Sequence, residues 1–274
     1  MKSINCKGEL IDLRSPKIMG ILNLTPDSFY DGGKYTSEKE ILLQIEKMID
    51  EGATFIDIGG YSSRPGAKHI SEKEEVLRII PVVNSLIKHF PNILLSIDTF
   101  RSEVAKQSID SGACMINDIS AGNLDSKMFE TIANLQVPYI IMHMIGTPQN
   151  MQNNVEYDNL IKDIIYFFSK KINALRELGV NDIVLDVGFG FSKTLDQNYE
   201  LLQNLNLFKN LDLPILTGIS RKSMLYKLLN ITPKEALNST SIANTIALLQ
   251  GANILRVHDV KETMETIKIV KKLN

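Results

Sequence analysis

Eight short runs of mainly aliphatic and β-branched residues recur along the chain, and segments with helical spacing separate them. Apolar residues recur every three or four positions in the separating segments, most plainly in 37–52, 71–90 and 159–179. This alternation predicts eight strands joined by helices, which is the pattern of parallel βαβ units. The predicted strands cover residues 17–23, 53–59, 92–98, 113–118, 137–143, 181–187, 213–219 and 253–258.

Eight parallel strands are the number that closes a (β/α)8 barrel, the TIM barrel, so we expect an α/β protein of this fold. An open, doubly wound sheet is the alternative. Residues 1–14 precede the first run and carry apolar positions on both sides of the Lys7-Gly8 pair, which predicts an N-terminal β-hairpin covering the bottom of the barrel. No shift in composition marks a boundary, and residues 1–274 are expected to form a single domain.

Composition narrows the class of protein. The chain has 274 residues, 44% hydrophobic and 23% charged, with a net charge of −2, so it lacks the basic surface that nucleic acid requires. No apolar run reaches the length of a membrane span, and the N-terminus lacks the apolar stretch of a secretory signal. Two cysteines, Cys6 and Cys114, are too few for a disulfide framework. We therefore expect a cytoplasmic protein that binds neither nucleic acid nor membrane.

Polar or charged residues stand at the predicted C-terminal end of almost every strand. In a TIM barrel these ends form the catalytic mouth. A rim with a purely structural role would not require them, because a buried polar group left unpaired costs about 1–3 kcal/mol. Each residue alone is more often structural than catalytic, as when an Asp after a strand caps a helix, but the whole set on one rim predicts an active site. Its members are Asn23, Asp98, Asn117, Asp118, His143, Asp186, Ser220, Arg221, Lys222, Arg256 and His258.

Two features of the set predict anion binding. Ser220 stands at the expected start of a helix, where backbone N–H groups and the helix dipole favour an anion. Arg256 and His258 follow in the last strand, close to the position where barrels often hold phosphate. The stretch SSRPG at 62–66 places Arg64 in a rigid turn and adds a weaker cationic signal.

A second group is acidic. Asp98, Asn117 and Asp186 are expected to converge within one rim beside Lys222. Carboxylate and amide groups together suit the edge of a heterocycle that carries both donors and acceptors. The same oxygens would also suit a divalent metal ion, and the residues themselves leave these two alternatives open.

Eight sequence blocks, in order over nearly the whole chain, resemble those of the dihydropteroate synthase family, folate-pathway enzymes that sulfonamides inhibit. Any single block would be a weak signal, but the ordered set is highly specific. The blocks are MGILNLTPDSFYDGG (19–33), DIGGYSSRPGA (57–67), SIDTFR (96–101), INDISAG (116–122), MHMIGTPQNMQ (142–152), LDVGFGFSK (185–193), GISRKSML (218–225) and LRVHDV (255–260).

The resemblance implies a reaction. Members of the family join 6-hydroxymethyl-7,8-dihydropterin pyrophosphate to p-aminobenzoate and release pyrophosphate, giving 7,8-dihydropteroate by a route that resembles SN1 substitution. The resemblance further implies a Mg²⁺ ion bound beside Asn23. It also implies a homodimer formed through late barrel helices, including residues 241–251.

The motif matches also imply residue roles. Asp186 would accept hydrogen bonds from the pterin 2-amino group and N3–H, Asn117 would pair with the adjoining ring edge, and Lys222 would donate to the 4-oxo and N5 side. Asp98 would face N8 and, with Asp186, stabilise the cation left when pyrophosphate departs. The implied catalytic residues are Asp98, Asp186, Lys222 and Arg256, and the pterin pocket adds Asn117, Met142 and Gly218.

The other substrate groups are assigned in the same way. Asn23, Arg256 and His258 would bind the pyrophosphate. The resemblance implies that the segments 25–33 and 62–66 are mobile loops that close over p-aminobenzoate and exclude water. The residues implied to contact p-aminobenzoate are Phe29, Ser63, Arg64, Pro65, Phe191 and Ser220.

Four residues depart from the family pattern. Tyr61 and Ser63 replace an acidic residue and a threonine, so we expect changed p-aminobenzoate affinity and sulfonamide sensitivity. Val187 and Ser192 replace a proline and a glycine, and we expect altered local stiffness without a change of reaction. The rival functions are a pterin-binding methyltransferase, a catalytically inactive pterin-binding or scaffold protein, and an aldolase that uses Lys222 as a Schiff base.

Overall fold

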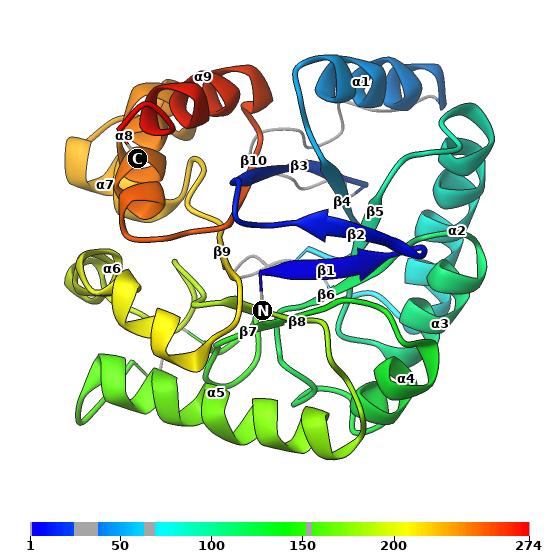
Figure 1. Cartoon of the computed structure of the whole chain (residues 1–274), viewed down its shortest axis with the longest axis horizontal. Coiled ribbons are helices and arrows are strands. Elements are labelled where there is room, and N and C mark those ends of the chain that lie inside the picture. The colour runs from blue at the N-terminus through cyan, green and yellow to red at the C-terminus, as the bar shows by residue number, and fades with distance from the viewer. Residues whose placement is uncertain (1, 25–37, 63–68, 152–154, 274) are drawn as a thin grey trace.

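The chain folds into a closed barrel of eight parallel strands surrounded by helices (Figure 1). The computed structural model describes residues 2–24, 38–62, 69–151 and 155–273. The strands are hydrogen-bonded in the order β10-β3-β4-β5-β6-β7-β8-β9, so the chain runs once around the barrel. They are β3 (Lys17–Asn23), β4 (Phe55–Gly59), β5 (Leu95–Asp98), β6 (Met115–Asp118), β7 (Tyr139–Met142), β8 (Ile183–Asp186), β9 (Ile215–Thr217) and β10 (Ile254–Val257). The TIM-barrel prediction is confirmed, and the open sheet is wrong.

Helices follow the strands around the barrel and form its outer layer (Figure 1). None of the helices in the described part of the chain combines the length and apolarity that a membrane span requires. The helices are α1 (Glu38–Asp50), α2 (Glu72–His89), α3 (Ser102–Asp110), α4 (Met128–Leu135), α5 (Leu160–Glu177), α6 (Leu195–Gln203), α7 (Ser223–Leu229), α8 (Leu237–Leu249) and α9 (Val260–Val270), with short 3-10 turns η1 (Leu205–Leu211) and η2 (Pro233–Glu235).

Helix α2 shows why the separating segments are helical. Ser71 caps its first turn by accepting a hydrogen bond from the Glu74 amide at 3.2 Å. Acidic residues occupy the first turn and basic residues the last, which complements the helix dipole. Ile79, Val83 and Leu86 are buried at spacings of three and four residues, so one face of the helix packs against the barrel.

All eight predicted strands are present, but most are shorter than predicted. The run 92–98, for example, contains β5 only from Leu95 onward. Ile93 is nevertheless buried in the core between sheet and helices, ahead of the strand. An apolar run therefore predicts which residues are buried, whereas a strand begins only where its backbone hydrogen-bonds to a neighbouring strand.

The N-terminal hairpin consists of β1 (Ser3–Cys6) and β2 (Glu9–Asp12), which pair antiparallel. Lys7 and Gly8 form its two-residue turn with positive φ values of 54° and 85°, the conformation of a type I′ hairpin turn. Apolar side chains of the hairpin pack against those at the start of the barrel strands, such as Ile4 and Leu13 with Phe55 and Met115. The hairpin crosses the near end of the barrel in Figure 1, so the prediction that it covers the bottom is confirmed.

Candidate active site

The polar site lies one layer above the apolar floor of the barrel. Successive inward-facing residues of a strand are two positions apart. Each of four strands places an apolar residue in the floor cluster and a polar residue two positions later, toward the open end. The pairs are Phe55 and Asp57, Met115 and Asn117, Val184 and Asp186, and Ile254 and Arg256.

Arg256 is the centre of one half of this polar layer. Its Nε donates to Asp57 Oδ2 at 2.6 Å, and its Nη2 donates to Asp98 Oδ2 at 2.8 Å. Asn117 Nδ2 donates to the same Asp57 oxygen at 3.0 Å. The structure therefore brings the predicted residues Asp98, Asn117 and Arg256 together. Asn117 joins this group through Asp57, a residue that the sequence analysis missed.

Asp57 is that missed residue, and its side chain is completely buried. It lies in the middle of β4, in the run FIDIG, whereas the search covered residues at the strand ends. A carboxylate inside a fully buried strand is itself a signal, because an unpaired buried charge is strongly unfavourable. Its position two residues after Phe55 also predicts that it faces the barrel interior.

Asp186 and Lys222 form the other half of the layer. Asp186 Oδ1 accepts a hydrogen bond from the Gly188 amide at 2.8 Å. A Cβ atom built on Gly218 would lie 3.7 Å from Lys222 Nζ and 4.0 Å from Asp186 Oδ2, so both groups converge beside a residue without a side chain. Lys222 Nζ also donates to Phe189 O at 2.5 Å and lies 4.7 Å from the centroid of the Phe191 ring.

The charges in this polar layer perturb one another. Burial raises the pKa of Asp98 to about 7, although Arg256 opposes the shift. Burial likewise raises the pKa of Asp186 and lowers the pKa of Lys222 to about 8, and each of these two opposes the shift of the other. Burial alone would lower the pKa of Arg256, but Asp57 and Asp98 outweigh it and raise that pKa. Strongly shifted groups of both signs in one cluster are typical of a catalytic site.

The predicted helix start at Ser220 is wrong. Helix α7 begins at Ser223, with Lys222 as its N-cap residue, and is only seven residues long. Ser220 Oγ instead lies 3.1 Å from His258 Nδ1, which joins two of the predicted residues. The chain between Ser220 and the helix turns through Arg221, whose φ is 55°.

Arg221 explains this local conformation. Its guanidinium forms a bidentate pair with Asp259, with both bonds at 2.8 Å, and also donates to the carbonyl groups of Pro233 and Lys234. Its amide donates to Thr240 Oγ1 at 3.0 Å. Arg221 therefore ties the β9–α7 loop to the segment after β10, and this arrangement places Ser220 beside His258.

Two polar residues near the strand ends make their contacts outside the polar layer. His143 packs edge-to-face on Phe167 of α5, with ring centroids 4.9 Å apart, and burial lowers its pKa to about 2. Its Nδ1 lies 3.1 Å from Lys193 Nζ, which also donates to Gly188 O and Phe191 O at 3.0 Å each. Asp118 accepts from Ser120 and from the Tyr139 hydroxyl, so it also serves the structure around the site.

The remaining predicted residues are partly within and partly outside the described chain. Met142 and Phe191 belong to a small apolar cluster at the rim. Gly218 follows β9, and the half-buried Asn23 ends β3 beside Gly59 of β4. Four residues predicted to contact p-aminobenzoate, Phe29, Ser63, Arg64 and Pro65, lie outside the described residues.

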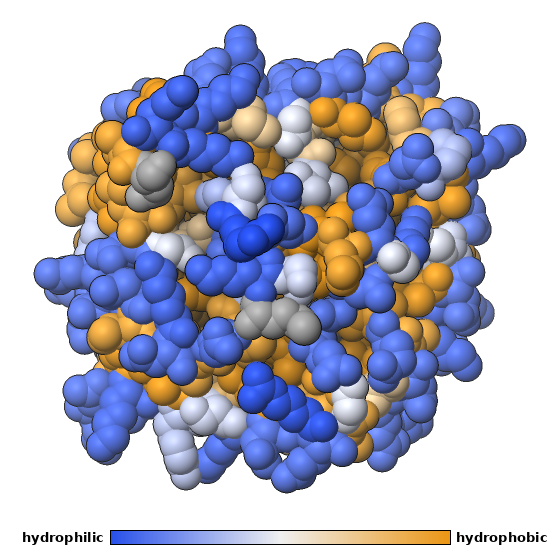
Figure 2. Space-filling view, in the orientation of Figure 1, coloured by the Kyte–Doolittle hydropathy of each residue, from blue (hydrophilic) through white to orange (hydrophobic). Residues whose placement is uncertain are grey.

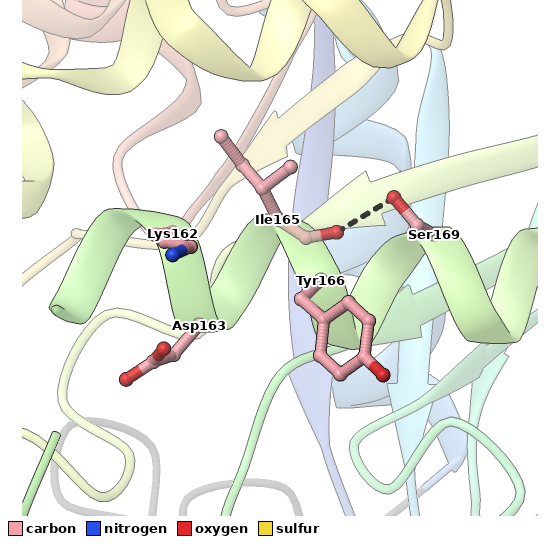
Figure 3. Close-up of a pocket in the computed structure, with 5 residues that line it drawn as sticks. All are labelled: Lys162, Asp163, Ile165, Tyr166 and Ser169. Carbon is pink, nitrogen blue, oxygen red and sulfur yellow. Dashed lines mark hydrogen bonds between the residues drawn. The ribbon is translucent and has the colours of Figure 1, made fainter. Parts of the chain in front are cut away.

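A separate hollow lies on the outer helical layer, along α5 (Figure 3). Its described lining comes from one helix: Lys162, Asp163, Ile165, Tyr166 and Ser169. Ser169 Oγ donates to Ile165 O at 3.0 Å, which is a bond within the helix. None of these lining residues belongs to the polar layer, so this hollow is separate from the candidate active site at the strand ends.

Known proteins share this fold and these blocks. The sequence profile of the pterin binding enzymes matches residues 19–258. The dihydropteroate synthase of Escherichia coli strain K12 is 42% identical over 267 residues, which cover 97% of this chain and 94% of that protein. The Yersinia pestis dihydropteroate synthase, solved in complex with a sulfonamide drug, superimposes with a TM-score of 0.95 at 43% identity, covering 99% of this chain and 98% of that one.

A second solved structure agrees. The Xanthomonas albilineans dihydropteroate synthase with 4-aminobenzoic acid has a TM-score of 0.91 at 34% identity, covering 99% of this chain and 98% of that one. The similarity therefore extends over the barrel, the hairpin and the strand ends that carry the polar layer. The chain belongs to the dihydropteroate synthase family of pterin binding enzymes.

Proposed function

We propose that the protein condenses 6-hydroxymethyl-7,8-dihydropterin pyrophosphate with p-aminobenzoate, releasing pyrophosphate and forming 7,8-dihydropteroate. One observation carries the proposal: the acidic and amide groups Asp98, Asn117 and Asp186 share one polar layer with the cations Lys222 and Arg256, in a chain of this family. Such a layer offers hydrogen bonds for a polar heterocycle and positive charge for its anionic leaving group.

Pterin recognition would depend on Asp186. The Gly188 amide holds one carboxylate oxygen, and the other points toward the space beside Gly218. That second oxygen would accept from the pterin 2-amino group or N3–H. Asn117, fixed by its bond to Asp57, would pair with the adjoining ring edge, and Lys222 would donate to the 4-oxo and N5 side. Strands β6, β7 and β8 are hydrogen-bonded side by side in the barrel, so Asn117 and Asp186 are already in place before the substrate arrives.

The chemical step would proceed by departure of pyrophosphate before attack by the amine. Loss of the leaving group places positive charge on the pterin methylene and ring. The buried carboxylates of Asp98 and Asp186 would face that charge and stabilise it. The neutral amine of p-aminobenzoate then attacks the methylene carbon and loses a proton, and no protein nucleophile is required.

Arg256, His258 and Asn23 would bind the pyrophosphate. Arg256 keeps its charge at any physiological pH, as arginine side chains do, and Asp57 and Asp98 raise its pKa further. Ser220 Oγ lies beside His258 Nδ1 and would orient the ring. Asn23 ends β3 at the open mouth, on the same rim as these groups.

Magnesium is proposed as the cofactor. The described residues contain no cluster of three His, Cys, Asp or Glu side chains suited to a metal. Mg²⁺ often takes one or two protein ligands and completes its shell with substrate phosphates and water, so a single amide oxygen from Asn23 fits this mode. When bound, the ion offsets negative charge on the pyrophosphate. Chelation with EDTA should suppress turnover and added Mg²⁺ should restore it, whereas full activity in EDTA would exclude the ion.

The p-aminobenzoate side would be formed by Phe191 and Ser220 together with Phe29, Ser63, Arg64 and Pro65. Lys222 Nζ lies 4.7 Å from the centroid of the Phe191 ring, so this ring is next to the proposed pterin position. The related Yersinia enzyme was solved with a sulfonamide drug. We therefore expect sulfonamides to compete with p-aminobenzoate here, which would appear as an inhibition that excess p-aminobenzoate relieves.

We also propose a homodimer formed through the late helices. Helix α8 exposes Ile242, Ile246 and Leu249, spaced four and three residues apart on one face. Figure 2 shows apolar surface gathered at the α7–α8 corner. Light scattering should give twice the chain mass for the protein and a monomer for Ile246→Glu, whereas Leu77→Glu on the exposed side of α2 should stay dimeric. A monomeric parent protein would refute this proposal.

A turnover assay tests the function. Purified protein with Mg²⁺ and both substrates should release pyrophosphate only when p-aminobenzoate is present, and equal release without it would indicate a hydrolase. Asp186→Asn should lose pterin binding while the fold survives. Asp182→Asn, just before the same strand at the opposite end of the barrel, is the matched control and should bind normally. Unchanged pterin affinity in Asp186→Asn would contradict the proposed recognition.

A further inference from the structure

A small apolar cluster, here called the rim cluster, lies apart from the main core. Its buried members include Tyr61, Phe100, Met142, Met144 and Met151, and Phe191 packs against it. These residues come from the ends of four different strands and the loops that follow them. The rim cluster therefore joins one residue proposed for the pterin, Met142, to one proposed for p-aminobenzoate, Phe191.

Tyr61 links this cluster to three loops. Its ring packs edge-to-face on Phe100, with centroids 5.0 Å apart, and the Arg101 guanidinium lies 5.4 Å from its centroid. Its hydroxyl accepts from Gln149 Nε2 at 2.6 Å and lies 3.2 Å from His69 Nδ1. A hydroxyl has one hydrogen to donate and lone pairs to accept, so both contacts are satisfied together when Nδ1 is unprotonated.

Ser192 makes a matching contact from the other side. Its Oγ accepts from the Ile145 amide at 2.9 Å and donates to Ile145 O at 2.8 Å, and its own carbonyl accepts from Tyr157 at 2.8 Å. Ser192 is completely buried with a φ of 50°. That left-handed conformation costs a residue with a side chain about 1–2 kcal/mol, and the hydrogen bonds of Ser192 offset the cost.

Both contacts end on the same piece of chain, residues 144–151, which follows β7. The segment is ordered by its own turn, in which Asn150 Oδ1 accepts from the Thr147 amide at 2.7 Å and the Met151 amide donates to Thr147 O at 2.8 Å. Ser192 holds it at Ile145, and Tyr61 holds it at Gln149. Met144 and Met151, the first and last residues of the segment, pack into the rim cluster.

We infer that Tyr61 and Ser192 are positioning residues for the p-aminobenzoate half of the reaction, acting by clamping segment 144–151 against the rim cluster. The inference rests on the function proposed above. Met142 is held in the strand ladder opposite Asp186, so these two pterin-side residues do not depend on the clamp. Phe191 lies in a loop directly before Ser192, and its position does depend on the clamp.

Substitution with kinetics tests the inference. Tyr61→Phe removes only the hydroxyl, and Ser192→Ala removes only Oγ. Each should raise the KM for p-aminobenzoate about threefold to tenfold, as expected for loss of about one hydrogen bond, and change the KM for the pterin substrate less than about twofold. Tyr199→Phe is the control, because its hydroxyl donates at 2.9 Å to Met224 O, away from the segment. Equal increases in both KM values would overturn the inference.

Ser192→Gly separates positioning from stability. Glycine removes the hydroxyl and also the conformational cost of a positive φ. The p-aminobenzoate KM should therefore rise as in Ser192→Ala, although the melting temperature should lie above that of Ser192→Ala. A KM that follows melting temperature across the variants would indicate a merely structural role.

Hydrogen exchange provides a readout that does not need activity. Backbone amides in 144–151, above all Ile145, should exchange faster in Ser192→Ala, and the amides near Gln149 should exchange faster in Tyr61→Phe. Tyr199→Phe should leave them unchanged. Unaltered exchange in both test variants would refute the clamp. A parent protein that shows no turnover would instead refute the proposed function, and the exchange result would still decide the clamp.

Discussion

Asp57 connects two residues of the polar layer, Arg256 and Asn117, so its removal should have a large effect. Truncation to alanine removes the acceptor of both Arg256 Nε and Asn117 Nδ2. A buried donor left without a partner costs about 1–3 kcal/mol, and breaking a buried ion pair costs about 3–5 kcal/mol. Arg256 keeps its second partner, Asp98, which limits the loss. We therefore expect Asp57→Ala to lower the free energy of unfolding by about 3–5 kcal/mol.

The conservative variant separates charge from shape. Asp57→Asn keeps an acceptor oxygen in place but loses the negative charge, so it should lose only about 1–2 kcal/mol. Both variants should also lower kcat/KM for the pterin substrate, because Arg256 loses the carboxylate that orients it. Asp110→Asn, at the exposed end of α3, changes the same chemical group without a buried partner and should stay within about 0.5 kcal/mol of the parent protein.

Urea unfolding followed by far-UV circular dichroism measures these differences, and thermal melts provide a second measure. For a chain of this size each kcal/mol moves the melting temperature by about 2–4 °C, so Asp57→Ala should melt roughly 10 °C lower. An Asp57→Ala protein as stable as Asp110→Asn would refute the view that Asp57 holds Arg256 and Asn117 in place.

Three further predictions follow from the same structure. Gly188→Ala should lose more than about 3 kcal/mol of stability, because its Cβ would lie 2.1 Å from the His143 carbonyl oxygen. Gly179→Ala, with a similar φ but open space around the Cβ, should lose only about 1–2 kcal/mol. Equal losses in urea unfolding would contradict this prediction. Burial lowers the pKa of Lys222 to about 8, so kcat/KM for the pterin substrate should fall as pH rises through 8 and the side chain loses its proton. Lys222→Arg, though less active, should lack this fall. The same fall in Lys222→Arg would exclude Lys222 as its source. Asp259→Ala removes the bidentate partner of Arg221 and should lose about 3–5 kcal/mol that high salt does not restore. A loss that disappears in salt would indicate a surface pair.

Local patterns in the sequence determined the elements and their class. Alternation of apolar runs with helical spacing predicted eight strands, the hairpin and the barrel, because strand and helix periodicity reflect backbone geometry that acts over a few residues. The same periodicity explains why the polar residues near the strand ends, from Asn23 to His258, were found. It did not separate Asn117 from Asp118, or Met142 from His143. Neighbouring residues of a strand face opposite sides, but these strands are buried on both sides, so the apolar pattern does not show which neighbour faces the barrel interior.

Tertiary structure decided which of these groups meet. Closure of the barrel turns Asn117 and Asp186 inward while His143 packs on α5, and it brings Asp57 to Arg256 across 199 positions of sequence. The conformation that joins Ser220 to His258 depends on Arg221 finding Asp259, 38 residues later. Such contacts depend on the register of distant strands, which no short stretch of sequence encodes. The sequence by itself therefore determined the barrel and the residues near its mouth, whereas the pairing of charges inside the mouth was decided only when the ring of strands closed.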